Sequence, residues 1–235
     1  MALAKRVRLG AMTLPFDAVL LDMDGTLLDS EPLWHQAEHQ IIEAYGATVD
    51  PEIQKTFTGV DTPTMIGRMR RAYGLEPSEA ELMAELGSTI KALLASVKPR
   101  PGATELLEFL KANNVKTALV SNSAVELIET SLAHQPWREV LAKRFSAEHV
   151  EHAKPAPDIY LLAAKELGAD PADCLVVEDS LTGVQAGVAA GMTCFAVPSQ
   201  VAGSLEQFKE LTPYVYGSLL EVVEQLQTPS SARTR

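Results

Sequence analysis

Two carboxylates stand two residues apart where the first apolar run of the chain ends. The run Ala18–Leu21 is followed by Asp22, Met23 and Asp24. Side chains at positions i and i+2 of an extended chain point to the same side. Of two carboxylates placed in this way, one can attack an electrophile and the other can donate and accept a proton. The pattern therefore predicts that Asp22 and Asp24 act together in catalysis.

The same change from apolar to polar residues occurs after two other short runs, 117–120 and 174–177. The polar residues that follow these runs are Ser121, Asn122, Glu178 and Asp179. In an open parallel sheet, ligands bind outside the carboxyl ends of the strands. We therefore expect all these side chains to meet those of Asp22 and Asp24 at one edge of a sheet.

These residue types predict a divalent cation and a phosphate ester. Asp22, Asp179 and the main-chain carbonyl of Asp24 supply hard oxygens of the kind that Mg²⁺ prefers. Carboxylates alone would repel an anionic phosphate, so a metal ion and a nearby lysine are needed to reverse the local charge. Hydroxyl and amide groups are suited to hold phosphoryl oxygens. The residues assigned to substrate binding are Ser121, Asn122 and Lys154.

Short apolar runs alternate with helical patterns over most of the chain. The predicted strands are 18–21, 117–120, 174–177 and 193–197, and the predicted helices between them are 104–112, 124–133, 157–167 and 182–190. Nearly continuous apolar runs of this length are typical of strands that are buried on both faces. The alternation predicts an α/β fold with a doubly wound, Rossmann-like parallel sheet.

One segment departs from this alternation. Residues 30–98 contain amphipathic helical stretches but no apolar run typical of a strand, and Pro99–Gly102 marks the return to the alternating pattern. We therefore predict an α-helical cap domain at 30–98, inserted into an α/β catalytic core. The predicted core, leader and tail are residues 15–29 with 99–227, the flexible segment 1–14, and the flexible segment 228–235.

The charge of the chain restricts its partners. It has 20 Lys and Arg against 31 Asp and Glu, which gives a net charge of −11. We expect no binding to nucleic acid or to an anionic membrane surface, since both require a basic surface. No run reaches the roughly 18 apolar residues that a membrane span needs. Two cysteines cannot form a disulfide framework, so we expect a cytoplasmic protein. The sequence carries no signal for an oligomer, so we expect a monomer by default.

In order and spacing, four groups of residues resemble the motifs of the haloacid dehalogenase superfamily of phosphohydrolases. The groups are Asp22–Thr26, Ser121, Lys154 and Glu178-Asp179. The position of the insert is similar to that of the superfamily's helical cap. The stretches 154–160 and 177–183 resemble the β-phosphoglucomutase-like branch, which includes many sugar-phosphate phosphatases.

The resemblance implies a role for each of these residues. Asp22 is the implied nucleophile, Asp24 the acid and base, and Lys154 steadies the nucleophile and the phosphate. Asp179 is an implied metal ligand, whereas Glu178 either binds the metal or supports its ligands. The implied activity is a Mg²⁺-dependent phosphomonoester hydrolase. It forms an aspartyl-phosphate and acts on a small phosphorylated metabolite, a sugar or polyol phosphate.

Three other functions fit part of the pattern. A dehalogenase of this superfamily needs neither a metal nor a second acid, so Asp24 and the Glu178-Asp179 pair count against it. A phospho-aspartate receiver module is much shorter than this chain and has no second carboxylate two positions on. The third alternative is a phosphomutase of the β-phosphoglucomutase type.

Two positions in the predicted cap disfavour the mutase. Trp34 stands where the mutases of the family carry a histidine, and Thr58–Thr62 stand where they carry a Lys-Gly-x-Ser-Arg stretch. A mutase needs such groups to hold a second phosphate. Arg68, Arg70 and Arg71 could supply a phosphate clamp from elsewhere in this segment, so the mutase is kept as an alternative. We nevertheless expect hydrolysis rather than phosphoryl transfer to a sugar.

Overall fold

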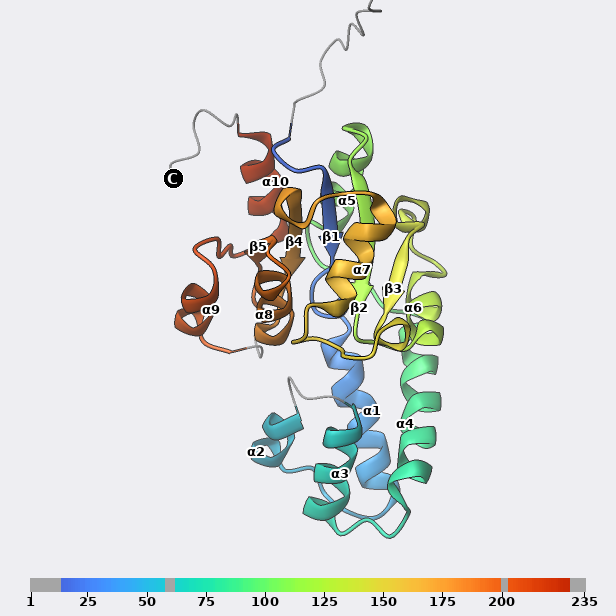
Figure 1. The fold of residues 1–235 in the computed structure, drawn as a ribbon. Coiled ribbons are helices and arrows are strands. Elements are labelled where there is room, and N and C mark those ends of the chain that lie inside the picture. The colour runs from blue at the N-terminus through green and yellow to red at the C-terminus, as the bar shows by residue number, and fades with distance from the viewer. Residues whose placement is uncertain (1–13, 58–61, 200–202, 229–235) are drawn as a thin grey trace, which may run out of the picture.

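A computed structural model describes residues 14–57, 62–199 and 203–228. Its centre is a five-stranded sheet with the order β3-β2-β1-β4-β5, in which every neighbouring pair is parallel (Figure 1). The strands are β1 (Ala18–Leu21), β2 (Lys116–Ser121), β3 (Arg144–Ser146), β4 (Cys174–Glu178) and β5 (Thr193–Ala196). The predicted α/β fold with a doubly wound parallel sheet is confirmed.

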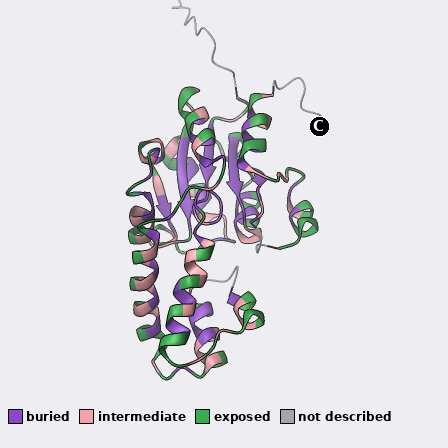
Figure 2. Cartoon of the chain, turned by 180° about the vertical axis from the view of Figure 1, so that it is seen from behind, coloured by how far each residue is buried: buried purple, intermediate pink, exposed green. Residues whose placement is uncertain are grey.

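Helices cover both faces of the sheet, because alternate residues of each strand point to opposite faces. Val19 and Leu21 of β1 belong to one apolar cluster, and Ala18 and Leu20 belong to another. Of the helices that cover the sheet, those that contribute to the first cluster are α5 (Ala103–Ala112), α6 (Val125–Leu132) and α10 (Leu219–Gln227). Those of the second are α7 (Asp158–Leu167), α8 (Leu181–Ala189) and α9 (Leu205–Leu211). Figure 2 shows the strands buried between these layers.

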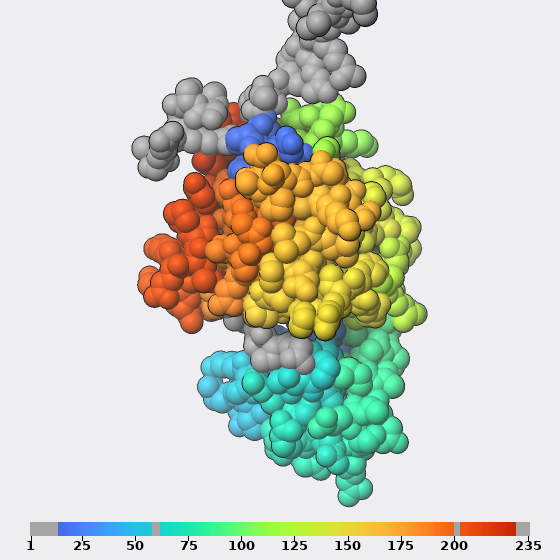
Figure 3. All heavy atoms as spheres, viewed as in Figure 1, coloured from blue at the N-terminus to red at the C-terminus, as the bar shows by residue number. Residues whose placement is uncertain are grey.

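Between β1 and β2 the chain forms a separate group of helices beyond the carboxyl ends of the strands (Figures 1 and 3). They are α1 (Glu31–Ala44), α2 (Pro51–Gln54), α3 (Thr62–Tyr73) and α4 (Glu79–Leu94), and α4 packs against both α1 and α3. Their apolar side chains, such as those of Ile41 and Leu82, continue the first cluster of the sheet. The domain boundaries at 30 and 98 stay a prediction.

Four short 3₁₀ helices complete the described structure. They are η1 (Lys55–Phe57), η2 (Arg138–Leu141), η3 (Ala147–His149) and η4 (Pro171–Asp173). Two connections join the helical group to the sheet, and they pair with each other. Leu28 forms an antiparallel bridge with Pro99, and the main-chain N–H of Asp29 donates to the carbonyl of Lys98 at 2.9 Å.

In the core, β3, α9 and α10 were not predicted from the sequence, nor were the short helix α2 and the four 3₁₀ helices. The strand β3 has only three residues, Arg144–Ser146, at the edge of the sheet, so it offers no apolar run. By contrast, α10 did carry a signal, because Leu219, Val222, Val223 and Leu226 have helical spacing and are buried. The predicted leader and tail lie outside the described residues, except for their ends at residues 14 and 228.

Among the described residues, no helix combines the length and the apolar character that crossing a bilayer requires. Cys174 and Cys194 are free and buried. They lie in the paired strands β4 and β5, where Cys194 is opposite Val176. The cytoplasmic location and the monomeric state stay predictions.

Gly102 provides a test of the packing between α5 and α10. Its φ is +89°, and a Cβ there would lie 2.8 Å from the main-chain nitrogen of Leu220. We expect Gly102→Ala to lower the free energy of unfolding by about 2–4 kcal/mol, because backbone strain adds to a clash. Gly74, with φ +62° and open space around it, is the control. For Gly74→Ala we expect only about 1–2 kcal/mol in urea unfolding, and equal losses would contradict the packing argument.

Candidate active site

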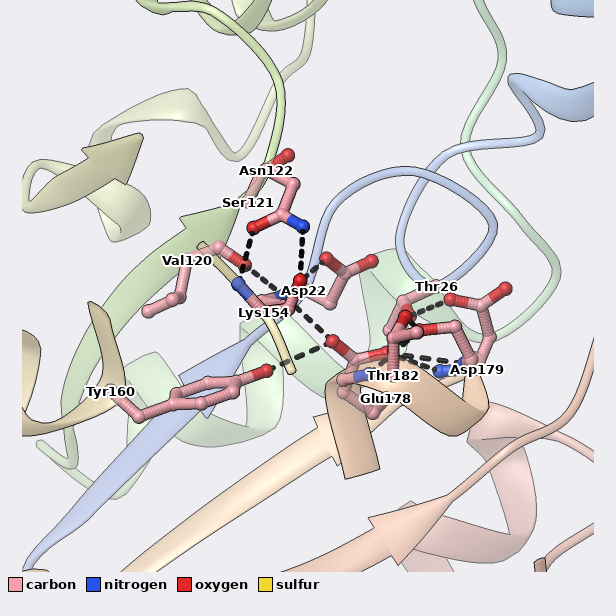
Figure 4. Close-up of polar contacts among 12 residues, drawn as sticks. Asp22, Thr26, Val120, Ser121, Asn122, Lys154, Tyr160, Glu178, Asp179 and Thr182 are labelled. Carbon is pink, nitrogen blue, oxygen red and sulfur yellow. Dashed lines mark hydrogen bonds and ion pairs between the residues drawn. The ribbon is translucent and has the colours of Figure 1, made fainter. Parts of the chain in front are cut away.

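The predicted site residues meet at the carboxyl edge of the sheet (Figure 4). The central strand β1 has β2 and β4 as its two neighbours, and Leu21 lies opposite both Leu119 and Val177. The residues at which these strands end are therefore adjacent in space. The buried polar residues gathered there are Asp22, Ser121, Lys154, Glu178 and Asp179. Asp24, which is half-buried, lies beside them.

Lys154 is the buried cation of this group. Its Nζ donates to Asp22 Oδ1 at 2.8 Å, to Glu178 Oε1 at 2.7 Å and to the carbonyl of Val120 at 2.8 Å. Burial works against the charged ammonium, but the carboxylates of Asp22 and Glu178 outweigh it and raise the pKa of Lys154 above its usual range. All three ammonium protons are thus used, and Lys154 stays charged.

Asn122 holds the main chain of Lys154. The main-chain N–H of Lys154 donates to Asn122 Oδ1 at 3.1 Å, and Asn122 Nδ2 donates to the carbonyl of Lys154 at 3.2 Å. The side chain of Asn122 is therefore engaged in positioning the lysine, which the sequence did not predict. Its predicted contact with substrate stays a prediction.

Glu178 is saturated with hydrogen bonds from the protein. Besides Lys154, its Oε1 accepts the hydroxyl of Tyr160 at 3.0 Å. Its Oε2 accepts the N–H groups of Asp179 and Ser180 at 3.1 and 3.2 Å, and the Ser180 hydroxyl at 3.0 Å. Gly183 in α8 leaves the space, since a Cβ there would lie 1.7 Å from Oε1. Glu178 is therefore fixed as a partner of Lys154.

Tyr160 supports the lysine in two ways. Its hydroxyl holds Glu178, and the Lys154 Nζ lies over its ring, 5.0 Å from the ring centroid. Tyr160 is fully buried. It is part of the stretch 154–160 that carries the family resemblance, but no role was predicted for it. The sequence signal that could have suggested a role is its place in that stretch, six residues after Lys154; in the structure it lies in α7.

Three carboxylates crowd together beside the lysine. Asp22, Glu178 and Asp179 each offer an oxygen within 4.8 Å of the others, and no second group of this kind occurs in the described parts of the chain. Burial, then Glu178, raises the pKa of Asp22 to about 7, although Lys154 opposes this. Burial, then Asp22 and Glu178, raises the pKa of Asp179 well above its usual range.

This donor set fits a hard divalent cation such as Mg²⁺. Three carboxylates face a single ammonium, so a further positive charge would lower the repulsion among them. Glu178 is already engaged on both oxygens, so Asp22 and Asp179 are the carboxylates with capacity for a metal ion. Asp179 is aligned by the hydroxyl of Thr26, which donates to its Oδ1 at 2.8 Å.

The turn after β1 brings Asp179 close to the main chain. Gly25 has φ +79°, and a Cβ there would lie 2.3 Å from Asp179 Oδ2. Glycine is thus required by the backbone conformation and by the approach of the carboxylate. The turn formed by Asp24, Gly25 and Thr26 therefore places the Thr26 hydroxyl within hydrogen-bond distance of the Asp179 carboxylate.

Asp24, the second carboxylate of the loop after β1, lies against two serines. Its Oδ2 accepts the Ser123 hydroxyl at 2.6 Å, and the Ser121 hydroxyl is 3.4 Å away. The short loop after β2 thus brings both hydroxyls to the second carboxylate. Ser123 was not predicted as a site residue, although its place two residues after Ser121 puts it on the same side.

Comparison with known proteins agrees with this geometry. Residues 16–191 match the family of haloacid dehalogenase-like hydrolases. The chain belongs to this family. The resemblance seen in the four groups of residues is therefore confirmed, and the chain is a hydrolase by family.

Several curated relatives are phosphatases by name. The chain is 36% identical over 182 residues to an Arabidopsis thaliana bifunctional riboflavin kinase/FMN phosphatase, covering 77% of this chain and 48%, about half, of that protein. It is 35% identical over 208 residues to a probable pseudouridine-5'-phosphatase of Drosophila melanogaster (81% and 90% covered). It is 30% identical over 195 residues to hexitol phosphatase B of Escherichia coli (81% and 87% covered).

Solved structures share the fold over most of their length. A putative β-phosphoglucomutase from Thermotoga maritima has a TM-score of 0.76 at 25% identity, covering 89% of this chain and 99% of that one. A hydrolase of the same family from Deinococcus radiodurans, solved with phosphate and sodium bound, has a TM-score of 0.75 at 30% identity. It covers 93% of this chain and 100% of its own.

The two contributions of Tyr160 can be separated by substitution. Tyr160→Phe removes the hydroxyl and keeps the ring, so we expect the free energy of unfolding to fall by about 1–3 kcal/mol through the lost hydrogen bond to Glu178. Tyr160→Leu also removes the ring below Lys154 and is expected to cost more. Urea unfolding measures both. The control is Tyr214→Phe, at a tyrosine that is 41% exposed, and a loss equal to that of Tyr160→Phe would contradict the role of the buried hydroxyl.

Proposed function

We propose that this protein is a Mg²⁺-dependent phosphomonoester hydrolase that acts on a small phosphorylated metabolite. The observation that carries the proposal is the ion pair of Lys154 with Asp22, 2.8 Å long, at the edge where three parallel strands end. A carboxylate and a cation at such an edge can bind a phosphoryl group and attack it. Membership in the hydrolase family supports the same reaction.

A sugar or polyol phosphate is the proposed substrate class. The relatives described above are named for FMN phosphatase, pseudouridine-5'-phosphatase and hexitol phosphatase activities. Each name refers to a small organic molecule rather than to a macromolecule. The net charge of −11 also disfavours nucleic acid as a partner, because binding its backbone requires a basic surface.

In the proposed reaction, a carboxylate oxygen of Asp22 attacks phosphorus and forms an aspartyl-phosphate. The bond between phosphorus and the leaving oxygen breaks, and that oxygen receives a proton from the Asp24 carboxyl. Water then attacks the aspartyl-phosphate while Asp24 takes its proton, and inorganic phosphate leaves. Lys154 and the Ser121 hydroxyl stabilise the negative charge on the phosphoryl oxygens.

Mg²⁺ is the proposed cofactor, held by Asp22, Asp179 and the main-chain carbonyl of Asp24. When bound, it would neutralise part of the charge shared by the carboxylates and the phosphate. Glu178 accepts five hydrogen bonds from the protein, so we assign it to orienting Lys154 rather than to binding the metal.

The helical group is proposed to act as a cap over this site. Helices α1–α4 lie beyond the strand ends at which the site residues gather (Figure 1). Such a cover can exclude water from the first step and can select the organic part of the substrate. We place it at residues 30–98, between the paired connections at Leu28 and Pro99.

Hydrolysis is favoured over a phosphomutase activity by the contacts of the cap. The Arg68 guanidinium donates to the carbonyl of Thr56, and Arg70 Nε donates to the carbonyl of Pro77 at 2.7 Å. Both arginines therefore have partners within the helical group. Trp34 is partly buried against the apolar cluster. Four of the five residues aligned with the mutase stretch, 58–61, lie outside the described residues.

The direct test is phosphate release from a panel of sugar, polyol and nucleoside phosphates. We expect release with Mg²⁺, none after removal of metal with EDTA, and poor activity with Ca²⁺, whose larger coordination shell misaligns the reacting atoms.

The nucleophile is tested by Asp22→Asn. We expect this variant to lose activity by about 10⁴-fold or more, because an amide cannot replace the attacking carboxylate. Circular dichroism checks that the variant is folded. Activity of Asp22→Asn above a few per cent would rule out the covalent route.

A second assay separates hydrolysis from mutase activity. The protein is incubated with β-glucose 1-phosphate and a trace of the 1,6-bisphosphate, and glucose 6-phosphate is measured against inorganic phosphate. We expect phosphate and no isomer, because Trp34 replaces the histidine of the mutases and because Arg68 and Arg70 are paired within the helical group. Isomer that forms faster than phosphate would overturn the assignment in favour of a phosphomutase.

A further inference from the structure

Ser123 is fixed in place by three contacts. Its main-chain N–H donates to Ser121 Oγ at 3.0 Å, and its carbonyl accepts the hydroxyl of Ser146 at 2.7 Å. Its own hydroxyl donates to Asp24 Oδ2 at 2.6 Å. Ser146 is fully buried at the end of β3. The loop after β2 is thus anchored to the neighbouring strand, and this anchoring sets the direction of the Ser123 hydroxyl.

The two oxygens of the Asp24 carboxylate have different surroundings. Oδ2 accepts the short hydrogen bond from Ser123, with Ser121 at the longer distance of 3.4 Å. Oδ1 is shielded from solvent and has no hydrogen-bond partner among the described residues. A shielded carboxylate oxygen without a donor costs free energy unless a ligand or a function accounts for it. Oδ1 is therefore the oxygen of Asp24 that has capacity for a further hydrogen bond.

We propose that Ser123 is a positioning residue that holds Oδ2 of Asp24, so that Oδ1 carries out the proton transfer. The inference rests on the proposed hydrolase function. Ser121 has a different role, since its longer contact allows its hydroxyl to turn to a phosphoryl oxygen while Ser123 keeps Asp24 in place. Ser123 thus orients Asp24, and Ser121 binds the phosphoryl group.

The step that depends on Ser123 is the departure of the alcohol. As the bond between phosphorus and the bridging oxygen breaks, its electron pair passes to that oxygen, which takes the proton from Asp24. A sugar or alkyl alkoxide is a poor leaving group and needs this proton, whereas p-nitrophenolate leaves without it. The loss of Ser123 should therefore affect the two kinds of ester differently.

The test compares kcat/KM for the best sugar or polyol phosphate of the panel with kcat/KM for p-nitrophenyl phosphate. For Ser123→Ala we expect a loss of about 10- to 100-fold with the sugar ester, part of the 10²–10⁴-fold contribution of a general acid. The loss with p-nitrophenyl phosphate is expected to be at least tenfold smaller. Ser123→Thr, which keeps a hydroxyl, should restore most of the activity on the sugar ester.

Two further variants make the result specific. Ser121→Ala should weaken both esters alike, because it removes a contact to the phosphoryl group itself. Adding Ser123→Ala to Asp24→Asn should cause little further loss, since Ser123 acts through Asp24. Equal losses on both esters, or a full additional loss in the double variant, would overturn the role of Ser123. A wild-type protein that hydrolyses neither ester would instead overturn the proposed function.

Discussion

The buried contacts of Lys154 hold the centre of this structure together. The ammonium joins Asp22 after β1, the Val120 carbonyl in β2 and Glu178 at the end of β4. One side chain thus ties three neighbouring strands at the edge where the site lies. A buried charge requires all its partners, and removing one of them from such a pair typically costs about 3–5 kcal/mol. Tyr160 supports this lysine through its hydrogen bond to Glu178, and Asn122 supports it through two hydrogen bonds to its main chain.

The same contacts leave the site with an excess of negative charge. Asp22, Glu178 and Asp179 are within 4.8 Å of one another, and Lys154 is the cation among them. Burial disfavours the charged form of Asp179, and Asp22 and Glu178 repel it, so the pKa of Asp179 lies well above its usual range. The site therefore has capacity for a further positive charge, which supports the proposed metal-assisted phosphate chemistry.

The catalytic loop and the connection to the helical group are one segment of chain. Asp24 and Gly25 lie five and four residues before Asp29, whose N–H donates to the carbonyl of Lys98 on the returning chain. Arg100, on the returning chain, donates through its guanidinium to the carbonyl of Gly25. The connection to α1–α4 and the main chain of the loop after β1 are consequently held by neighbouring hydrogen bonds to the same returning segment. The proposed substrate selection by the cap and the proposed proton transfer by Asp24 therefore share a structural support.

The sequence by itself determined the fold class and the group of residues at the sheet edge. Apolar runs that are followed directly by Asp22, Ser121 or Glu178 are local patterns that can be recognised in the sequence. Because parallel strands end at the same edge of a sheet, these residues are expected to meet there. Only the tertiary structure decided how these residues are divided between supporting and reacting groups. Contacts such as Ser123 to Asp24, or Tyr160 to Glu178, join residues 99 and 18 positions apart. They depend on strand register and rotamers, which emerge only when the whole core is packed, and no local pattern contains them.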